Sequence, residues 1–303
     1  MTVMEKPEKE NKLKKTIERL LIFFIGLPAV IGIVICLPYY HNLVMNIVVI
    51  FFSGIGAVEF SSMLAKKNII NHKIESFILG ALAPIAITVH ISFDLPQWIV
   101  FAIIMSGAGW VLLSRIFSRS TQIETITNQI VGGFSLIVYP GYFMYWLIKM
   151  SGWGYPGVIL LFLLISFGSD SAAWLFGSLF GKNNRGLIAV SPNKSIAGFL
   201  GGIFGSVLVA VLALFIFPSV FAAGKPDIPP VSALLHIAII IGSCTGLAAI
   251  LGDLAESAIK RSCDFKDSGN MMLGRGGVLD SIDSIAAAAP VFYFLFYLLV
   301  LTK

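Results

Sequence analysis

The chain has 303 residues, of which 57% are hydrophobic and 12% are charged, and its mean hydropathy is +0.91. A composition this apolar excludes an ordinary soluble domain and indicates an integral membrane protein. The net charge of +5 fits basic loops that face anionic lipid, so we expect no nucleic acid as a partner. Cys36, Cys244 and Cys263 are scattered and form no CxxC pair, so we expect neither a disulfide nor a zinc site.

Long apolar segments run through most of the chain. A helix needs about 20 apolar residues to cross the bilayer, and continuous rather than alternating apolar sequence favours helices over a β-barrel. We therefore predict an all-α, polytopic integral membrane protein with about nine transmembrane helices. The predicted helices cover roughly 20–40, 43–64, 76–93, 97–114, 128–148, 156–180, 196–218, 232–252 and 282–301.

The basic residues test this number of helices, because cytoplasmic loops of membrane proteins carry an excess of Lys and Arg. With a cytoplasmic N-terminus, 18 of the 21 basic residues fall in cytoplasmic segments, and only Lys149, Lys225 and Lys303 do not. We therefore predict a cytoplasmic N-terminus and a C-terminus on the opposite side. The first apolar segment is too long for a cleavable signal peptide and lacks a small-residue cleavage site.

Three parts follow from this topology. We expect a charged cytoplasmic tail at 1–19, N-terminal transmembrane helices at 20–150, and a C-terminal transmembrane region at 151–303 that carries the candidate functional residues. The last part contains two longer polar loops, 181–195 and 253–281, both on the predicted cytoplasmic side. Function is therefore expected on that side.

Two carboxylates interrupt apolar segments. Glu59 lies near the inner end of the second segment, where it is either a snorkelling or capped residue at the interface or a functional residue, and the sequence favours neither alternative. Asp170 lies in the middle of the sixth segment. An unpaired carboxylate there would cost roughly several kcal/mol, so Asp170 needs a partner, a cation or a water-filled cavity.

The segment 252–283 concentrates polar residues: six of the 16 acidic and four of the 21 basic residues lie in it. If the eighth helix continues into the cytoplasm, its polar residues share one face, because they are spaced i, i+3, i+4 and i+7. The start of the ninth helix repeats this spacing, so two helix ends can present carboxylates to one point. The residues concerned are Asp253, Glu256, Ser257 and Lys260 in the first group, and Asp280, Asp283 and Ser284 in the second.

These residue types suit metal-assisted phosphoryl or nucleotidyl transfer. Mg²⁺ takes one or two carboxylates and completes its shell with phosphate and water. Lys260, Arg261 and Lys266 can neutralise phosphate oxygens, and Gly276 and Gly277 allow the backbone to approach a phosphate. The alternative, to which the spacing gives equal weight, is a solvated connecting loop.

The other polar loop contains Ser191-Pro192-Asn193-Lys194-Ser195 directly before the seventh helix. A Ser-Pro turn with a neighbouring Lys at a helix start suits an anion site. The alternative, which sequence logic alone favours, is a capped helix start followed by small residues for helix packing.

The segment 252–283 resembles the C-terminal motif of the phosphatidate cytidylyltransferases (CDP-diacylglycerol synthases), and the resemblance covers about residues 156–301. Upstream, Asp170-Ser171 with Phe176-Gly177 and Phe180-Gly181-Lys182 is similar to a second segment of the family, and Ser191-Pro192 with Lys194-Ser195 and Gly198 to a third. The N-terminal half matches only as hydrophobic segments plus Glu59. In the C-terminal motif the matching residues are Gly252, Asp253, Leu254, Glu256, Ser257, Lys260, Arg261, Lys266, Asp267, Gly269, Gly274, Gly276, Gly277, Asp280 and Asp283.

The resemblance implies the reaction of CTP with phosphatidate to give CDP-diacylglycerol and pyrophosphate. It also implies Mg²⁺, with a second cation as an open option, and a homodimer in the inner (plasma) membrane whose active site faces the cytoplasm. The catalytic residues it implies are Asp283, Asp267, Lys260, Arg261 and Lys266. The substrate-binding residues it implies are Lys194, Ser191, Ser257, Arg275, Gly276 and Gly277, and the metal ligands are Asp253, Asp280 and Glu256.

The chain departs from the family pattern at four positions: Arg275 stands in place of His, Ser281 of Arg, Leu273 of Pro and Ala197 of Glu. One hypothesis is that Arg275 supplies the charge missing at Ser281; the other is an altered substrate preference or a weakened enzyme.

The competing functions are a CTP-dependent lipid kinase, a synthase acting on another lipid phosphate, and an inactive paralogue or transporter. We favour an interfacial enzyme over a transporter, because the polar groups other than Asp170 gather at the predicted cytoplasmic edge and no internal repeat is visible.

Overall fold

Helices make up the regular structure of the part of the chain that the computed structural model describes, which is residues 25–117, 123–186, 188–222, 228–272 and 276–302. No β-strand occurs in these ranges. The predicted all-α class is confirmed.

Eight of the predicted transmembrane segments, the second to the ninth, correspond to helical stretches in the described residues that are long and apolar enough to cross a membrane. Two of these stretches are compound, because a π-helical segment, Ile137–Tyr142, joins α6 to α7, and another, Tyr297–Leu301, follows α11. The helices are α3 (Tyr39–Ala65), α4 (Lys73–Ser92), α5 (Trp98–Ile116), α6 (Ile126–Leu136), α7 (Phe143–Ser151), α8 (Pro156–Phe180), α9 (Ile196–Ile216), α10 (Val231–Ser262) and α11 (Leu279–Phe296).

The first predicted segment, 20–40, begins outside the described residues. Its described part contains α2 (Leu27–Cys36), whose 10 residues span about 15 Å. The hydrocarbon core is about 30 Å thick, so α2 by itself does not cross it. The first crossing therefore stays a prediction.

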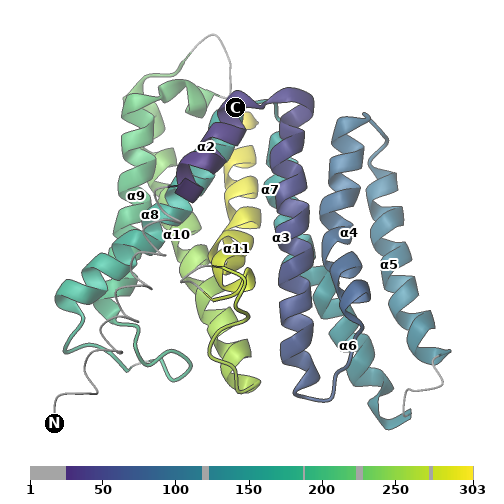
Figure 1. Ribbon diagram of the computed structural model, residues 1–303. Helices are drawn as coiled ribbons and strands as arrows, with labels where there is room; N and C mark the ends of the chain where they lie inside the picture. The colour runs from purple at the N-terminus through teal and green to yellow at the C-terminus, as the bar shows by residue number, and fades with distance from the viewer. Residues whose placement is uncertain (1–24, 118–122, 187, 223–227, 273–275, 303) are drawn as a thin grey trace.

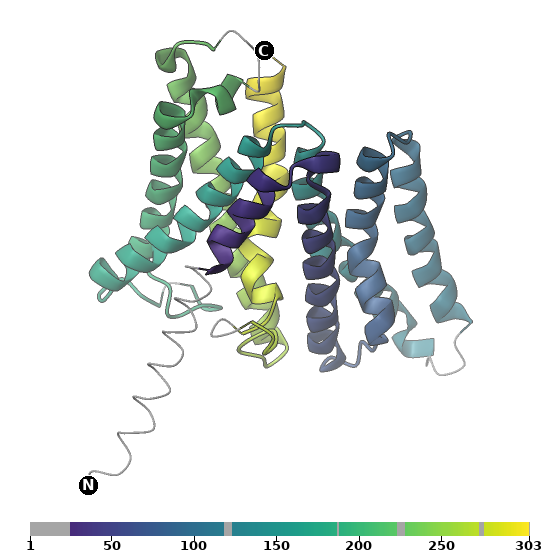
Figure 2. The same cartoon turned by 45° about the horizontal axis from the view of Figure 1, so that its top comes forward.

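Helix α11 lies in the middle of the bundle and packs against α10, α7, α3 and α8. Figures 1 and 2 show α8, α9 and α10 on one side of α11, and α3, α4 and α5 on the other. Small residues allow the helices to approach closely. A Cβ built on Gly205 of α9 would lie 2.3 Å from the Cβ of Ala172 of α8, so only glycine fits that crossing.

The basic residues gather at one end of the bundle, as the topology predicted. Helices α3, α5, α8 and α10 end there, and α4, α9 and α11 begin there, at the lower end in Figure 1. Lys149, near the end of α7, lies at the other end. Among the described residues, the basic ones at the lower end are Lys66, Lys67, Lys73, Arg115, Lys182, Arg185, Lys194, Lys260, Arg261 and Lys266. Which side of a membrane each end faces stays a prediction.

Candidate functional site

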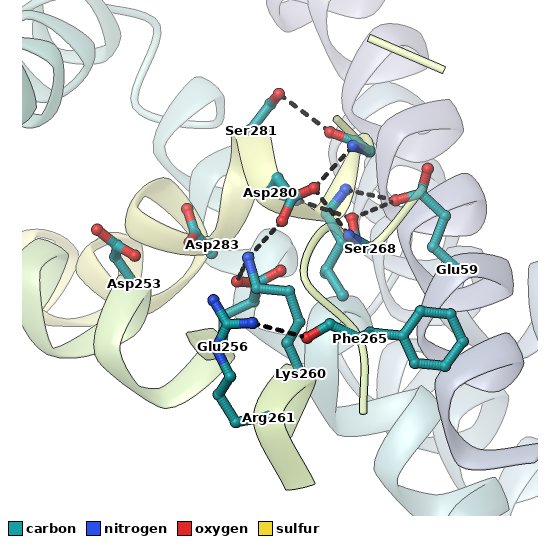
Figure 3. A network of polar contacts seen from close by, with 12 residues as sticks. Glu59, Asp253, Glu256, Lys260, Arg261, Phe265, Ser268, Asp280, Ser281 and Asp283 are labelled. Carbon is teal, nitrogen blue, oxygen red and sulfur yellow. Dashed lines mark hydrogen bonds and ion pairs between the residues drawn. The ribbon is translucent and has the colours of Figure 1, made fainter. Parts of the chain in front are cut away.

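Carboxylates and lysines meet where α10 ends and α11 begins (Figure 3). Gly252 permits this contact, because a Cβ there would lie 2.7 Å from the backbone oxygen of Asp283. Helix α10 continues to Ser262, so the i, i+3, i+4, i+7 spacing does place its polar residues on a helix. The predicted loop 253–281 is correspondingly shorter. Its first ten residues belong to α10 and its last three belong to α11, and the ion pair between Lys260 and Asp280 joins these two parts.

Lys260 links the two helices. Its Nζ donates a hydrogen bond to Oδ1 of Asp280 at 2.5 Å and forms an ion pair with Glu256. The side chains of Lys260 and Asp280 are only 12% and 8% exposed, so solvent screens their attraction weakly. Oδ2 of Asp280 accepts the backbone N–H groups of Ser268 at 2.9 Å and Gly277 at 2.7 Å. Asp280 therefore fixes the loop between the helices onto the start of α11, where the helix dipole also favours a carboxylate.

Glu59 of α3 belongs to the same site, although it lies more than 200 positions away in the chain. Its carboxylate is buried and accepts three hydrogen bonds: from Oγ of Ser268 at 2.9 Å, from the backbone of Val278 at 3.0 Å and from the backbone of Leu279 at 2.8 Å. The first N–H groups of a helix have no partner within the helix. Glu59 supplies that partner for α11, so it is neither a snorkelling residue nor a free surface carboxylate.

Gly276 and Gly277 make these approaches possible. A Cβ on Gly277 would lie 2.0 Å from Oγ of Ser268 and 2.4 Å from Oε2 of Glu59. Gly276 has φ of +100°, in the region that favours glycine. The sequence predicted that these glycines approach a phosphate, and in the structure they approach the protein's own carboxylates. Their part in substrate binding stays a prediction.

Lys194 and Asp253 connect the loop before α9 to α10. Their side chains form an ion pair at 2.6 Å. The Asp253 side chain is 38% exposed, whereas Nζ of Lys194 is buried and the exposed part of the Lys194 side chain is its aliphatic stem. The neighbouring Ser195 caps α9, since its Oγ accepts the N–H of Gly198 at 3.0 Å. The capped helix start is thus confirmed, and Lys194 lies directly before it, paired with Asp253 of α10. Ser191 lies in the turn before Lys194 and is half-buried.

Asp283 and Asp170 are joined through Ser284. The Ser284 hydroxyl donates to Oδ1 of Asp170 at 3.3 Å and lies 3.4 Å from Oδ1 of Asp283. The same Asp283 oxygen accepts the backbone N–H of Ser284 at 2.6 Å. Asp283 is buried. The carboxylate of α8 that required a partner therefore finds one on α11.

The remaining predicted site residues lie at the margin of this cluster. Arg261 is exposed and donates a hydrogen bond to the backbone oxygen of Phe265 at 3.2 Å. Lys266 and Asp267 are exposed on the loop, and Ser257 is half-buried on α10. The structure does not test their predicted roles. Arg275 and Leu273 lie outside the described residues, so the hypothesis that Arg275 compensates for Ser281 stays a prediction.

The donor chemistry of the cluster fits a hard cation. The described residues of the site include six carboxyl groups and two lysines: Asp253 pairs with Lys194, and Glu256 and Asp280 pair with Lys260. The other three carboxyl groups, those of Glu59, Asp170 and Asp283, bind N–H and hydroxyl groups of the protein. Oε1 of Glu256 is buried and accepts no hydrogen bond, and such an atom usually has a partner. In the described ranges, however, no three His, Cys, Asp or Glu side chains already form a metal-binding group. The three predicted ligands instead face lysines, and a substrate phosphate would have to complete a metal shell.

A family profile matches most of this chain, and individual known proteins resemble about half to two thirds of it. A sequence profile of the cytidylyltransferase family matches residues 17–299. A protein of Bacillus subtilis (strain 168), named phosphatidate cytidylyltransferase, is 34% identical over 175 residues, which are 57% of this chain and 60% of that protein. A Haemophilus influenzae protein of the same name is 38% identical over 149 residues, 48% of each chain. The uncharacterized protein YnbB of Escherichia coli (strain K12) is 30% identical over 202 residues, 64% of this chain and 63% of its own. Each match thus spans less than two thirds of the relative.

Proposed function

Because the chain belongs to the cytidylyltransferase family, we propose that it transfers the cytidylyl group of CTP to phosphatidate. A phosphate oxygen of phosphatidate forms a bond to the α-phosphorus of CTP, the bond from that phosphorus to the oxygen of the β-phosphate breaks, and pyrophosphate leaves. The lipid product is CDP-diacylglycerol. The observation that carries the proposal is the cluster of carboxylates and lysines at the α10–α11 junction. The names of the relatives in B. subtilis and H. influenzae support it.

The length of α10 supports a site at the membrane–water boundary. Its 32 residues extend about 48 Å, whereas the hydrocarbon core is about 30 Å thick. The last turns, which carry Glu256 and Lys260, therefore extend beyond the hydrocarbon when the start of the helix lies at the opposite surface. A site there is accessible to a soluble nucleotide and to a lipid headgroup together.

The residues of the cluster have distinct roles in the proposed reaction. Lys260 and Lys194, now paired with carboxylates, would turn to phosphate oxygens of the substrates through charge-assisted hydrogen bonds. Asp253, Glu256 and Asp280 would hold Mg²⁺, which neutralises phosphate charge when bound. Glu59 touches no substrate in this scheme and positions the start of α11.

The experiment follows the two ends of the triphosphate. The purified chain in lipid nanodiscs receives phosphatidate, Mg²⁺ and CTP labelled at either the α- or the γ-phosphate. The proposal expects the α-label in lipid and the γ-label in pyrophosphate, whereas a lipid kinase would place the γ-label in lipid and release CDP. Asp283→Asn should abolish the transfer, while Asp264→Asn, an exposed acidic residue of the same segment, should leave it unchanged. Label that never reaches lipid would contradict the proposal.

We also propose that the lower end of the bundle faces the cytoplasm of an inner (plasma) membrane and that the chain forms a homodimer. Single cysteines at Asn270, in the α10–α11 loop, and at Asp94, in the α4–α5 turn, should react with an impermeant thiol reagent from opposite sides. Labelling of both from one side would overturn the orientation. For the dimer, the protein is purified in detergent and its molar mass is measured by light scattering, with the detergent contribution subtracted. A mass of two chains is expected, and a mass of one chain would overturn the dimer.

A further inference from the structure

An apolar cavity of about 190 Å³ lies between the helices next to the site. Helices α3, α7, α8 and α11 form its walls, and α2 covers one side. Typical lining side chains are Val48 and Phe52 of α3, Leu147 of α7, Phe167 of α8 and Ile285 of α11. These residues come from both halves of the chain, so the cavity exists only in the assembled bundle.

The cavity begins beside the carboxylate cluster. Ser281, which lines the cavity, directly follows Asp280 in α11, and its hydroxyl donates to the backbone oxygen of Gly277 at 3.2 Å. Met272, also in the lining, belongs to the α10–α11 loop and exchanges backbone hydrogen bonds with Gly276. Figure 3 places Ser281 and Lys260 on opposite sides of Asp280. If the phosphate of a lipid binds at Lys260, its apolar tail can therefore extend past Asp280 into the cavity.

We propose that this cavity holds part of one acyl chain of the lipid phosphate substrate, an inference that rests on the proposed function. A cavity of about 150 Å³ lined by Leu, Ile and Phe accommodates benzene. By that measure the space takes roughly six to eight carbons, and the rest of a long chain must leave between the helices into the bilayer. Lipid tails are as apolar as the lining, so transfer from bilayer to cavity gains little. The cavity thus selects the shape of the chain and the placement of the headgroup.

Photocrosslinking tests occupancy without relying on turnover. A phosphatidate that carries a diazirine in the middle of one acyl chain is added at low mole fraction to phosphatidylcholine nanodiscs containing the protein, and adducts are mapped by peptide mass spectrometry. The proposal expects adducts on Phe52, Phe167 or Ile285 that excess unlabelled phosphatidate suppresses and excess phosphatidylcholine does not. Adducts confined to bilayer-facing side chains, or equal competition by both lipids, would overturn it.

A pair of variants on α3 fills or spares the cavity. Val48→Phe places a phenyl ring into the cavity that Val48 lines. Val44→Phe makes the same change one turn earlier in α3, on a side chain that is 40% exposed and does not line the cavity. Val48→Phe should lower the competed adducts at least fivefold, and Val44→Phe should change them less than twofold. In pyrophosphate release, Val48→Phe should lower kcat/KM at least fivefold for sixteen-carbon chains and less than twofold for four-carbon chains.

The outcomes separate this inference from the proposed function. Competed adducts in the cavity together with no cytidylyl transfer would refute the reaction but support the acyl site. Cytidylyl transfer together with no competed adducts in the cavity would refute the acyl site alone. An equal loss of kcat/KM for both chain lengths in Val48→Phe would also count against it.

Discussion

The hydrogen bonds of Glu59 provide the sharpest test of how the site is held together. Oε2 accepts from Ser268 and Leu279, and Oε1 accepts from Val278. In Glu59→Gln the amide has one oxygen, so its NH₂ group must face at least one of these buried donors. A hydrogen bond to a charged group contributes about 1.5–3 kcal/mol, and an unsatisfied buried donor costs about 1–3 kcal/mol. We expect the closed form of the α10–α11 loop to lose about 2–3 kcal/mol.

Cys263 reports this loss directly, because it is buried directly after α10, at the start of the loop. In a background with Cys36→Ser and Cys244→Ser, a thiol reagent should reach Cys263 only when the loop opens. A loss of 2–3 kcal/mol corresponds to labelling about 30–150 times faster, since about 1.4 kcal/mol is tenfold. Pyrophosphate release should fall at least tenfold, because Asp280 is no longer held in place.

The matched control is Glu75→Gln. Glu75 of α4 is also a largely buried carboxylate, but it pairs with Arg115 at 2.9 Å, outside the site. Its loss should leave the labelling of Cys263 within twofold of the starting protein. If Glu59→Gln labels Cys263 no faster than Glu75→Gln and keeps its activity, the reasoning that Glu59 holds the loop is wrong.

Three further predictions concern the same cluster. Lys260→Met leaves the buried carboxylates of Glu256 and Asp280 without their cation. We expect the free energy of unfolding to fall by about 3–5 kcal/mol and kcat/KM to fall at least a hundredfold. The control Arg261→Met, at an exposed neighbouring position, should change thermal stability little. Gly277→Ala should lower the melting temperature and activity because its Cβ collides with Ser268 and Glu59, whereas Gly109→Ala has open space around the new Cβ and should be neutral or stabilising. Chelation of divalent cations should stop cytidylyl transfer and added Mg²⁺ should restore it, so activity that persists in excess chelator would argue against the proposed metal.

The transmembrane helices could be predicted because about 20 continuous apolar residues are a direct requirement of the bilayer. The second to ninth segments were confirmed for this reason. Boundaries were less certain where polar residues extend a helix, as in α10, which runs ten residues beyond the predicted end of 232–252. The family resemblance is also confirmed, and the profile match extends it from about 156–301 to 17–299.

The partners within the site could be predicted only where they lie close in the chain. Helical spacing placed Glu256 and Lys260 together, and this contact forms. The same spacing carries no signal for the pairing of Glu59 with Val278, which is separated by 219 positions. Nor could it show that Asp280 would accept protein N–H groups, because the turn of the loop depends on contacts from α3. Sequence patterns report local geometry, whereas this site is made by tertiary packing.

The contact between Glu59 and the start of α11 also orders events during synthesis. A ribosome adds about 5–20 residues per second, so Glu59 is made roughly 10–45 s before Val278, with which it pairs across 219 positions. Throughout that interval the Glu59 carboxylate, near one end of α3, lacks the N–H donors of Val278 and Leu279. A nascent or truncated chain that stops before α11 therefore cannot bury this group by the contact that serves it in the finished protein. Quality-control proteases and insertion chaperones would therefore meet a chain in which α3 does not yet contact α11.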